Sequence, residues 1–169
     1  DYTRLKSPQL KTIKNHNRSV LTKALPFDLT NAQSLVIREI DGDLTRGHPM
    51  LRLLQGDVGS GKTLVAALSA LPVIEAGFQV ALMAPTELLS EQHAGQFSEW
   101  FSPLGISVGW LTGSMKIRPR RAMLEHLANG KCQMVIGTHA LFQDEIYFDR
   151  LGLVIVDEQH RFGVAQRLS

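Results

Sequence analysis

The chain has 169 residues, of which 44% are apolar and 20% charged, which is enough for one domain with a substantial core and excludes a disordered polyelectrolyte. No apolar run approaches the ~18 residues that span a bilayer, and nothing resembles a signal peptide. The single cysteine, Cys132, excludes a disulfide within the chain and suits a reducing cytosol. Since the chain begins with Asp1 and not with Met, we expect it to be a fragment of a longer protein.

The net charge of +2 is unevenly distributed. Residues 1–26 hold six Lys or Arg against one Asp, for a charge of +5, whereas residues 27–169 hold twelve against fifteen acids, for a charge of −3. A basic segment either follows nucleic-acid phosphates or is the solvated face of a linker helix. Ser7-Pro8 is typical of a helix start, and apolar residues recur at helical spacing up to Pro26. We therefore predict a basic linker helix within 1–26.

The rest of the chain predicts an alternation of helices and strands. A second helix is expected from Thr30 to Leu44, ended by Gly47 and Pro49. Short apolar runs then predict strands at 50–54, 80–84, 108–111, 134–136 and 151–156, and amphipathic stretches predict helices at 62–76, 86–101 and 119–129. This alternation indicates an α/β fold with a mostly parallel sheet, covered by helices on both faces.

The segment after the first predicted strand fits the phosphate-binding pattern G-x-x-x-x-G-K-[ST] at every fixed position. Its residues are Gly56, Asp57, Val58, Gly59, Ser60, Gly61, Lys62 and Thr63. The glycines let several backbone N–H groups converge on phosphate oxygens, and the helix that follows adds its partial positive charge. Lys62 is expected to neutralise the β- and γ-phosphates of ATP, and Thr63 to give a hydroxyl ligand to Mg²⁺.

Two carboxylates follow the last predicted strand, in the order Asp157-Glu158-Gln159-His160. A parallel strand that ends in acids places them at the edge of the sheet that also carries the phosphate loop. Since a buried acid needs a cation, Asp157 is expected to bind Mg²⁺ through water, and Glu158 to orient and deprotonate the attacking water. The alternative, a solvated pair with a salt-bridged neighbour, is disfavoured beside an intact phosphate loop.

Several motifs occur in a fixed order, namely LPFDLTNAQ, LLQGDVGSGKT, VALMAPTELLSEQH, GTHALFQ and VIVDEQHRFGV. This order resembles that of superfamily 2 helicases, whose motor consists of two RecA-like domains, and more narrowly that of the bacterial ATP-dependent helicases of branched DNA. The match covers nearly all of residues 25–169. The translocases that couple transcription to repair are similar here, but their acidic box usually has Glu at the position of Gln159.

The resemblance implies that residues 27–169 are a C-terminally truncated RecA-like ATP-binding domain. With ATP and Mg²⁺ it would drive movement on double-stranded DNA and remodel branched junctions, such as stalled forks, in recombination and repair. The wedge domain that recognises the junction and the second RecA-like domain, which supplies an arginine finger, are not in this sequence. Such a motor works in the bacterial cytoplasm, at the nucleoid. A P-loop kinase and a non-catalytic DNA-binding module are the rival classes.

Further nucleotide contacts follow from the resemblance alone. Phe27 and Gln33 fall where such motors grip adenine, Phe27 by packing and Gln33 by hydrogen bonds. However, Thr30-x-x-Gln33 is also a capping box, in which the glutamine folds back onto its own helix start, and the sequence leaves both roles open. Gln159 and His160 match positions that sense the γ-phosphate and couple it to DNA or to the second domain.

The resemblance also implies contacts with the DNA strand, at Pro85, Thr86, Glu87, Gly113, Thr138 and His139. Thr86 can in addition cap a helix whose free N–H groups receive a phosphate. Contacts with phosphate and sugar carry little sequence information, as a motor on any sequence requires. On the same helix, we expect Leu88, Leu89, Phe97 and Phe101 to belong to the core.

One dense basic cluster stands in residues 27–169, formed by Lys116, Arg118, Arg120 and Arg121. It either contacts DNA or is the solvated start of a helix, and the sequence does not decide between them. His139 and His160 have no partners suited to a zinc site.

Overall fold

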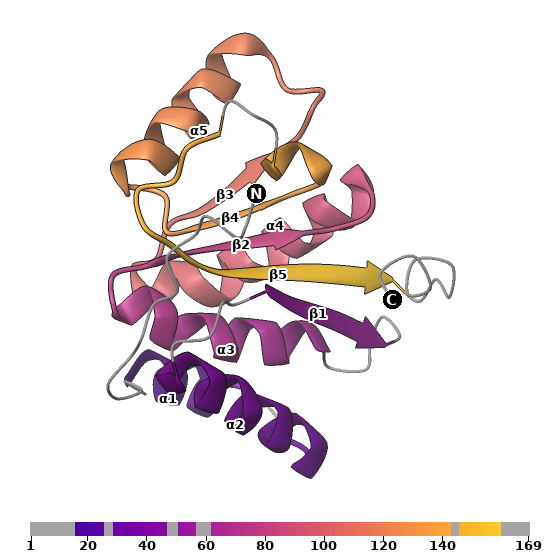
Figure 1. Ribbon diagram of the computed structural model, residues 1–169, viewed down its shortest axis with the longest axis vertical. Helices are drawn as coiled ribbons and strands as arrows, with labels where there is room; N and C mark the ends of the chain where they lie inside the picture. Colours follow the sequence, from indigo (N-terminus) through magenta and orange to yellow (C-terminus); the bar gives the residue numbers. More distant parts are fainter. Residues whose placement is uncertain (1–15, 26–28, 47–50, 57–61, 143–145, 160–169) are drawn as a thin grey trace.

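The computed structural model describes residues 16–25, 29–46, 51–56, 62–142 and 146–159. Within these ranges a parallel sheet lies between layers of helices (Figure 1). The strands are β1 Leu51–Gly56, β2 Gln79–Met83, β3 Val108–Leu111, β4 Met134–Gly137 and β5 Leu151–Gln159. The helices are α1 His16–Ala24, α2 Asn31–Arg46, α3 Lys62–Glu75, α4 Glu87–Phe101 and α5 Ile117–Asn129, with short 3-10 turns η2 Ser102–Leu104 and η3 His139–Phe142. The predicted α/β fold is confirmed.

The order of the strands is β1-β5-β2-β4-β3, and every neighbouring pair is parallel. The carboxyl ends of the described strands therefore share one edge, which we call the carboxyl edge. β1 and β5 form one half of this edge, and β2, β4 and β3 form the other, so that the two halves meet between β5 and β2. In open α/β sheets, ligands bind outside this edge.

β5 is longer than the sequence indicates. The predicted strand ended at Val156, but pairing with β1 continues through Asp157, which lies opposite Leu54, as far as Gln159, which lies opposite Gly56. The two acids are among the last residues of the strand, at the carboxyl edge as predicted, because the ladder with β1 extends over them. The backbone of Asp157 is consequently fixed by a neighbouring strand.

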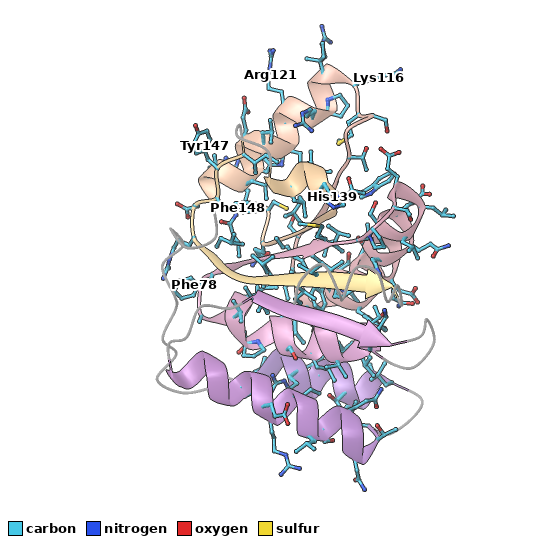
Figure 2. All side chains as sticks on the ribbon, turned by 45° about the vertical axis from the view of Figure 1, so that its right-hand side comes forward. Phe78, Lys116, Arg121, His139, Tyr147 and Phe148 are labelled. Atoms are coloured by element: carbon cyan, nitrogen blue, oxygen red, sulfur yellow. The ribbon has the colours of Figure 1, made fainter. Side chains whose placement is uncertain are left out.

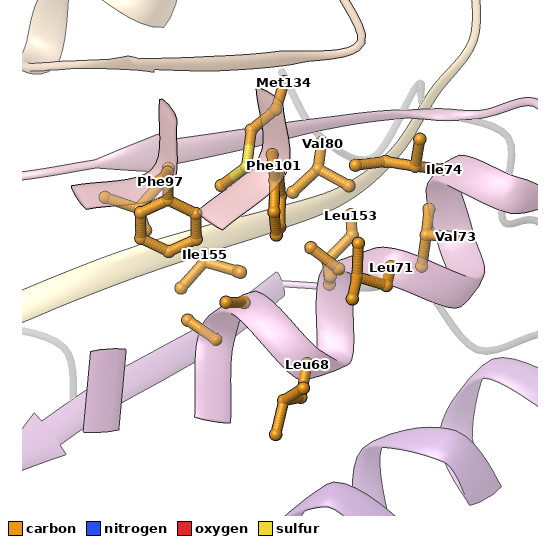
Figure 3. Packing of buried hydrophobic residues seen from close by; sticks show 14 of the residues in the cluster. Leu68, Leu71, Val73, Ile74, Val80, Phe97, Phe101, Met134, Leu153 and Ile155 are labelled. Carbon is orange, nitrogen blue, oxygen red and sulfur yellow. The ribbon is translucent and has the colours of Figure 1, made fainter. Parts of the chain in front are cut away.

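Apolar side chains fill both faces of the sheet. On one face α3 and α4 pack against the strands, and Figure 3 shows part of this cluster, with Phe97 and Phe101 fully buried. α1 and α2 cover the outer side of α3 (Figure 1). On the other face, Leu127 of α5 joins a smaller cluster with Val135 and Val154. Because helices cover both faces, the strands carry continuous apolar runs instead of alternating ones.

The side chains of α4 differ from the prediction at one position. Phe97 and Phe101 belong to the core as expected, but Leu88 is 64% exposed and Leu89 is only partly buried. Leu88 precedes Phe97 by nine residues, which places it about 180° around a helix of 3.6 residues per turn. The prediction of a core role for Leu88 is therefore wrong.

α1 is packed into the body of the domain through Leu21 and Arg18. Leu21 is 5% exposed and joins the main core. Arg18 Nη1 and Nη2 donate to the two carboxylate oxygens of Asp41 on α2, at 2.8 and 2.9 Å. Its Nε donates to the carbonyl oxygen of Leu68 at 2.9 Å, which lacks its usual helical donor because Pro72 has no N–H. Arg18 thus ties α1 and α2 to α3, whereas the predicted helix start at Ser7-Pro8 and the break at Pro26 lie outside the described residues.

Cys132 is only 2% exposed, and its thiol donates to the carbonyl oxygen of Met134. Burial raises the pKa of this thiol to about 11, so it stays protonated at neutral pH. Among the helices of the described ranges, none is both long and apolar enough to cross a membrane.

Candidate functional site

The carboxylate of Asp157 is the centre of the candidate site, on β5 at the carboxyl edge. Lys62 Nζ, from the first residue of α3, lies 2.7 Å from Asp157 Oδ1. His93 Nε2, from α4, lies 2.6 Å from Asp157 Oδ2. The three side chains are only 7%, 3% and 11% exposed for Lys62, Asp157 and His93 respectively. Each carboxylate oxygen therefore has a buried partner from a different helix.

Asp157 is ionised in these surroundings. Burial by itself raises the pKa of this carboxyl group, but the hydrogen bonds from His93 and Lys62, together with the positive charge of Lys62, hold the pKa below its usual value. Because an ionised carboxylate only accepts hydrogen bonds, Nε2 of His93 carries a proton and donates it. A carboxylate kept charged inside the fold is the kind of oxygen ligand that Mg²⁺ binds.

Lys62 and Thr63 open α3, where the phosphate-loop pattern places them. Gly56 ends β1 beside Gln159 of β5. Asp57, Val58, Gly59, Ser60 and Gly61 lie outside the described residues, and their contacts with phosphate stay a prediction. The fold nevertheless brings Lys62 into contact with Asp157, 95 residues further along the chain.

The remaining predicted nucleotide contacts are only partly described. The backbones of Glu158 and Gln159 belong to β5, but nothing is described of their side chains, and His160 and Phe27 lie outside the described residues. Gln33 takes the capping arrangement, since its Oε1 accepts from the N–H of Thr30 at 2.9 Å and its own N–H donates to Thr30 Oγ1 at 3.1 Å. Contact of Gln33 with adenine requires a different rotamer of this side chain.

The other half of the carboxyl edge carries the residues expected to contact a DNA strand. Pro85, Thr86 and Glu87 follow β2 and are exposed. Thr86 caps α4 as predicted, because its Oγ1 accepts from the N–H of Leu89 at 3.1 Å. Ser114 Oγ, beside the exposed Gly113, donates to Glu87 at 3.2 Å. The structure thus brings the segments after β2 and β3 together.

The segment after β4 lies at the same edge. Thr138 is half-buried and its carbonyl oxygen accepts from the N–H of Leu141, while His139 is exposed. Further out, Figure 2 shows Lys116 and Arg121 projecting outward at α5. Within the basic cluster, Lys116, Arg118 and Arg121 are exposed, whereas Arg120 is partly buried. The exposure of these three fits either of the roles left open for the cluster.

Most of the chain matches the profile of a known family. The sequence profile described as DEAD/DEAH box helicase matches residues 30–168. The chain belongs to this helicase family. The match extends from the capping box of α2 to beyond the acidic box, and so covers both halves of the carboxyl edge.

Relatives of this helicase chain occur in several bacteria. The ATP-dependent DNA helicase RecG of Haemophilus influenzae is 57% identical over 169 residues, which cover 98% of this chain and 24% of that protein. RecG of Escherichia coli K12 is 60% identical over 158 residues, covering 94% and 22%. A solved structure of RecG bound to a three-way DNA junction has 47% identity and a TM-score of 0.82, covering 93% and 21%. The indicated resemblance to branched-DNA helicases is confirmed, and the chain spans less than a quarter of these relatives.

The residues of this helicase domain fit a magnesium ion that is held mainly by water and nucleotide phosphates. Within the described residues, no three His, Cys, Asp or Glu side chains are grouped to hold a metal by themselves. Mg²⁺ bound beside nucleotides usually takes only one or two protein oxygens. Asp157, ionised and buried, and Thr63, half-buried at the start of α3, provide a donor set of that size.

His93 is the site residue that sequence reasoning missed. It lies 64 residues before Asp157 in the sequence, on a helix, and so shares no local motif with the acidic box. One signal was available, because His93, Phe97 and Phe101 recur every four residues and so share one face of α4. A histidine in line with two core aromatics is buried and needs a polar partner inside the fold.

Proposed function

We propose that the chain is the N-terminal RecA-like motor domain of an ATP-dependent DNA helicase that remodels branched double-stranded DNA in recombination and repair. Residues 27–169 are the motor domain, and residues 1–26 are a basic linker whose helix α1 packs against it. The motor binds ATP and Mg²⁺ and works with a wedge domain and a second RecA-like domain of the same polypeptide, in the bacterial cytoplasm at the nucleoid.

The division of the carboxyl edge carries this proposal. The residues with phosphate and acid chemistry follow or end β1 and β5, which are neighbours in the sheet, and we call this part of the edge the nucleotide half. The segments expected to contact DNA follow β2, β4 and β3, which are also neighbours, and we call this part the DNA-facing half. Two ligands can therefore bind side by side at one edge, as the conversion of ATP hydrolysis into movement requires.

The chemistry follows from the residues of the nucleotide half. Lys62 neutralises charge on the phosphates, while Thr63 and Asp157 hold Mg²⁺, which when bound offsets the negative charge that builds up during phosphoryl transfer. Glu158 orients the attacking water and accepts its proton. Phe27 packs on adenine, and Gln159 and His160 report the γ-phosphate to the DNA-facing half or to the second domain.

The DNA-facing half supports contact with one strand regardless of its sequence. The N–H groups at the start of α4, beside Thr86, are oriented for a backbone phosphate. Pro85, Glu87, Gly113 and the Thr138-His139 turn line the neighbouring strand ends, where they contact phosphate and sugar. The basic cluster on α5 lies beyond these contacts.

The test is the ATPase activity of the full-length protein with no DNA, with linear duplex and with forked DNA. We expect the highest rate with forked DNA, because the wedge domain selects junctions. Phosphate transfer to an acceptor without DNA would indicate a kinase instead, and salt-dependent DNA binding that ignores ATP would indicate a non-catalytic module.

The isolated 169-residue chain provides a second test. We expect it to bind nucleotide weakly and to hydrolyse it little, because a missing arginine finger is worth about 10³–10⁵ in rate in related systems. Robust DNA-stimulated turnover by the isolated chain would contradict the assignment of the arginine to a second domain.

A further inference from the structure

Among the residues that the structure describes, a direct contact between the side chains of His93 and Asp157 joins the nucleotide half and the DNA-facing half of the carboxyl edge. Asp157 belongs to β5, and His93 belongs to α4, which begins shortly after β2. The 2.6 Å distance between His93 Nε2 and Asp157 Oδ2 therefore bridges the place where the two halves meet. No role follows for His93 from the chemistry proposed above.

Contacts on both sides of His93 fix the first part of α4. Near its start, Ser90 Oγ accepts from Trp110 Nε1 at 2.8 Å and donates to the carbonyl oxygen of Glu87 at 2.7 Å. Beyond His93, the ring of Phe97 contacts the imidazole edge-on, with centroids 6.5 Å apart. A helix held in this way moves as a unit, so a shift at Thr86 displaces His93, about 10 Å further along the axis.

The position of Asp157 depends on His93 once Lys62 turns to phosphate. In the structure Lys62 Nζ donates to Oδ1 and His93 donates to Oδ2. Under the proposed function, Lys62 binds the β- and γ-phosphates, so that Oδ1 of Asp157 loses its hydrogen-bond donor. Among the described residues, His93 is then the only side chain that donates to the carboxylate.

We infer that His93 is the positioning residue that holds Asp157 in place for Mg²⁺ and passes the displacement of α4 by a DNA strand to the ATP site. This inference rests on the proposed function and adds to it a positioning residue, His93, and a physical connection between the DNA-facing half and the nucleotide half. Residues that orient a metal ligand are worth about 10–100-fold in metal affinity or activity when they are replaced. His93 does not touch the nucleotide, so its effect runs through Asp157.

Variants of His93 in the full-length protein test the inference. His93→Gln keeps an amide N–H near the place of Nε2, whereas His93→Asn is one bond shorter and cannot reach Oδ2, so the two differ mainly in reach. His93→Phe removes the donor altogether. Trp110→Phe is the control, because it removes a partly buried hydrogen bond of α4 without touching Asp157.

Two measurements separate positioning from a merely structural role. The first is the ATPase rate with and without forked DNA, with KM for ATP. The second is the affinity for a fluorescent ADP analogue with and without Mg²⁺, which does not depend on turnover. For His93→Asn and His93→Phe we expect about a tenfold or larger loss of DNA-stimulated kcat and of the gain in affinity from Mg²⁺, and KM for ATP rises together with the loss of that gain.

His93→Gln should recover most of both quantities, and Trp110→Phe should retain both, even if their melting temperatures fall. Equal behaviour of His93→Gln and His93→Asn, or losses in Trp110→Phe that match those of His93→Phe, would overturn the inference. If His93→Phe does not fold, the comparison of Gln with Asn still decides. Absence of DNA stimulation in the wild-type protein would instead count against the proposed function, and the Mg²⁺ measurement would then decide the role of His93 alone.

Discussion

Two ion pairs hold α3, and they are built differently. Near the middle of the helix, Arg18 binds both carboxylate oxygens of Asp41 and the carbonyl oxygen of Leu68, with side chains 13% and 20% exposed for Arg18 and Asp41. At the start of the helix, Lys62 makes one 2.7 Å contact with Asp157, and both are more deeply buried. The Arg18–Asp41 pair is less buried but makes more hydrogen bonds than the Lys62–Asp157 pair.

This difference in geometry indicates that the Arg18–Asp41 pair is structural and that the Lys62–Asp157 pair can exchange partners. A guanidinium in a two-pronged contact is held by several directional bonds, whereas an ammonium is a compact point charge that can turn to another anion. Arg18 also serves the carbonyl group that Pro72 leaves without a helical donor. We therefore expect the Arg18 pair to determine stability and the Lys62 pair to determine activity.

The largest effect is expected from Lys62→Ala in the full-length protein. ATPase activity should fall by at least about 10³-fold, because the positive charge on the phosphates is lost at the reacting centre. DNA binding should remain close to that of the wild type, since the residues proposed to contact the DNA strand lie on the other half of the carboxyl edge. Steady-state ATPase and DNA-binding titrations check both, and turnover near the wild-type rate would refute the phosphate-loop assignment.

Arg18→Ala should give the opposite pattern. We expect a loss of about 2–3 kcal/mol in the free energy of unfolding, because Asp41 and the Leu68 carbonyl group both lose a partly buried partner. The ATPase rate per folded molecule should change little. Denaturant unfolding and ATPase measurements on the same preparation test this, and a loss of activity without a loss of stability would reverse the comparison.

Pro72 offers a control for Arg18. Pro72→Ala restores an N–H that can donate to the Leu68 carbonyl group within α3, so part of the role of Arg18 becomes unnecessary. In a double-mutant cycle, Arg18→Ala should therefore cost less in the Pro72→Ala background than in the wild type. Additive costs would show that the Leu68 contact contributes nothing.

A smaller effect on stability is expected from Arg18→Lys, which keeps the positive charge but removes the planar guanidinium group that bonds both oxygens of Asp41. The loss should be about 1 kcal/mol, since one ammonium cannot reach both oxygens of Asp41 and the carbonyl oxygen of Leu68 at once. Thermal unfolding beside Arg18→Ala measures the difference. If Arg18→Lys were as stable as the wild type, charge alone would explain the pair, and its geometry would not distinguish it from Lys62–Asp157.

The sequence predicted the parts of the molecule that depend on local spacing. Lys62 and Asp157 were identified because each belongs to a short motif beside a strand, and a parallel sheet brings such motifs to one edge. The capping roles of Thr30 and Thr86 were also within reach, since a cap spans only a few residues.

The sequence could not predict contacts that depend on packing between distant elements. His93 meets Asp157 across 64 residues, and Arg18 meets the Leu68 carbonyl group across 50. Pro72 does indicate that a carbonyl group inside α3 needs another donor, but not which one. Leu88 was assigned to the core because an apolar residue on a helix is more often buried than exposed.

The smallest effect is expected from substitutions in the capping box of Thr30 and Gln33. They test whether the contact between these two side chains is permanent, like that of Arg18, or is exchanged for a ligand, as proposed for Lys62. In the structure Gln33 and Thr30 bond to each other, as a permanent structural pair does, whereas the resemblance to this family implies a contact of Gln33 with adenine. We expect Thr30→Ala and Gln33→Ala each to lower stability by about 0.5–1 kcal/mol, because each removes one bond of the cap. Only Gln33→Ala should also raise KM for ATP, because the side chain of Gln33 can turn from Thr30 to the adenine base. This exchange would parallel the proposed turn of Lys62 from Asp157 to phosphate. Thermal unfolding and KM measured on both variants decide the matter: if both raise KM equally, the effect comes from the start of α2, and Gln33 keeps its partner permanently, like Arg18.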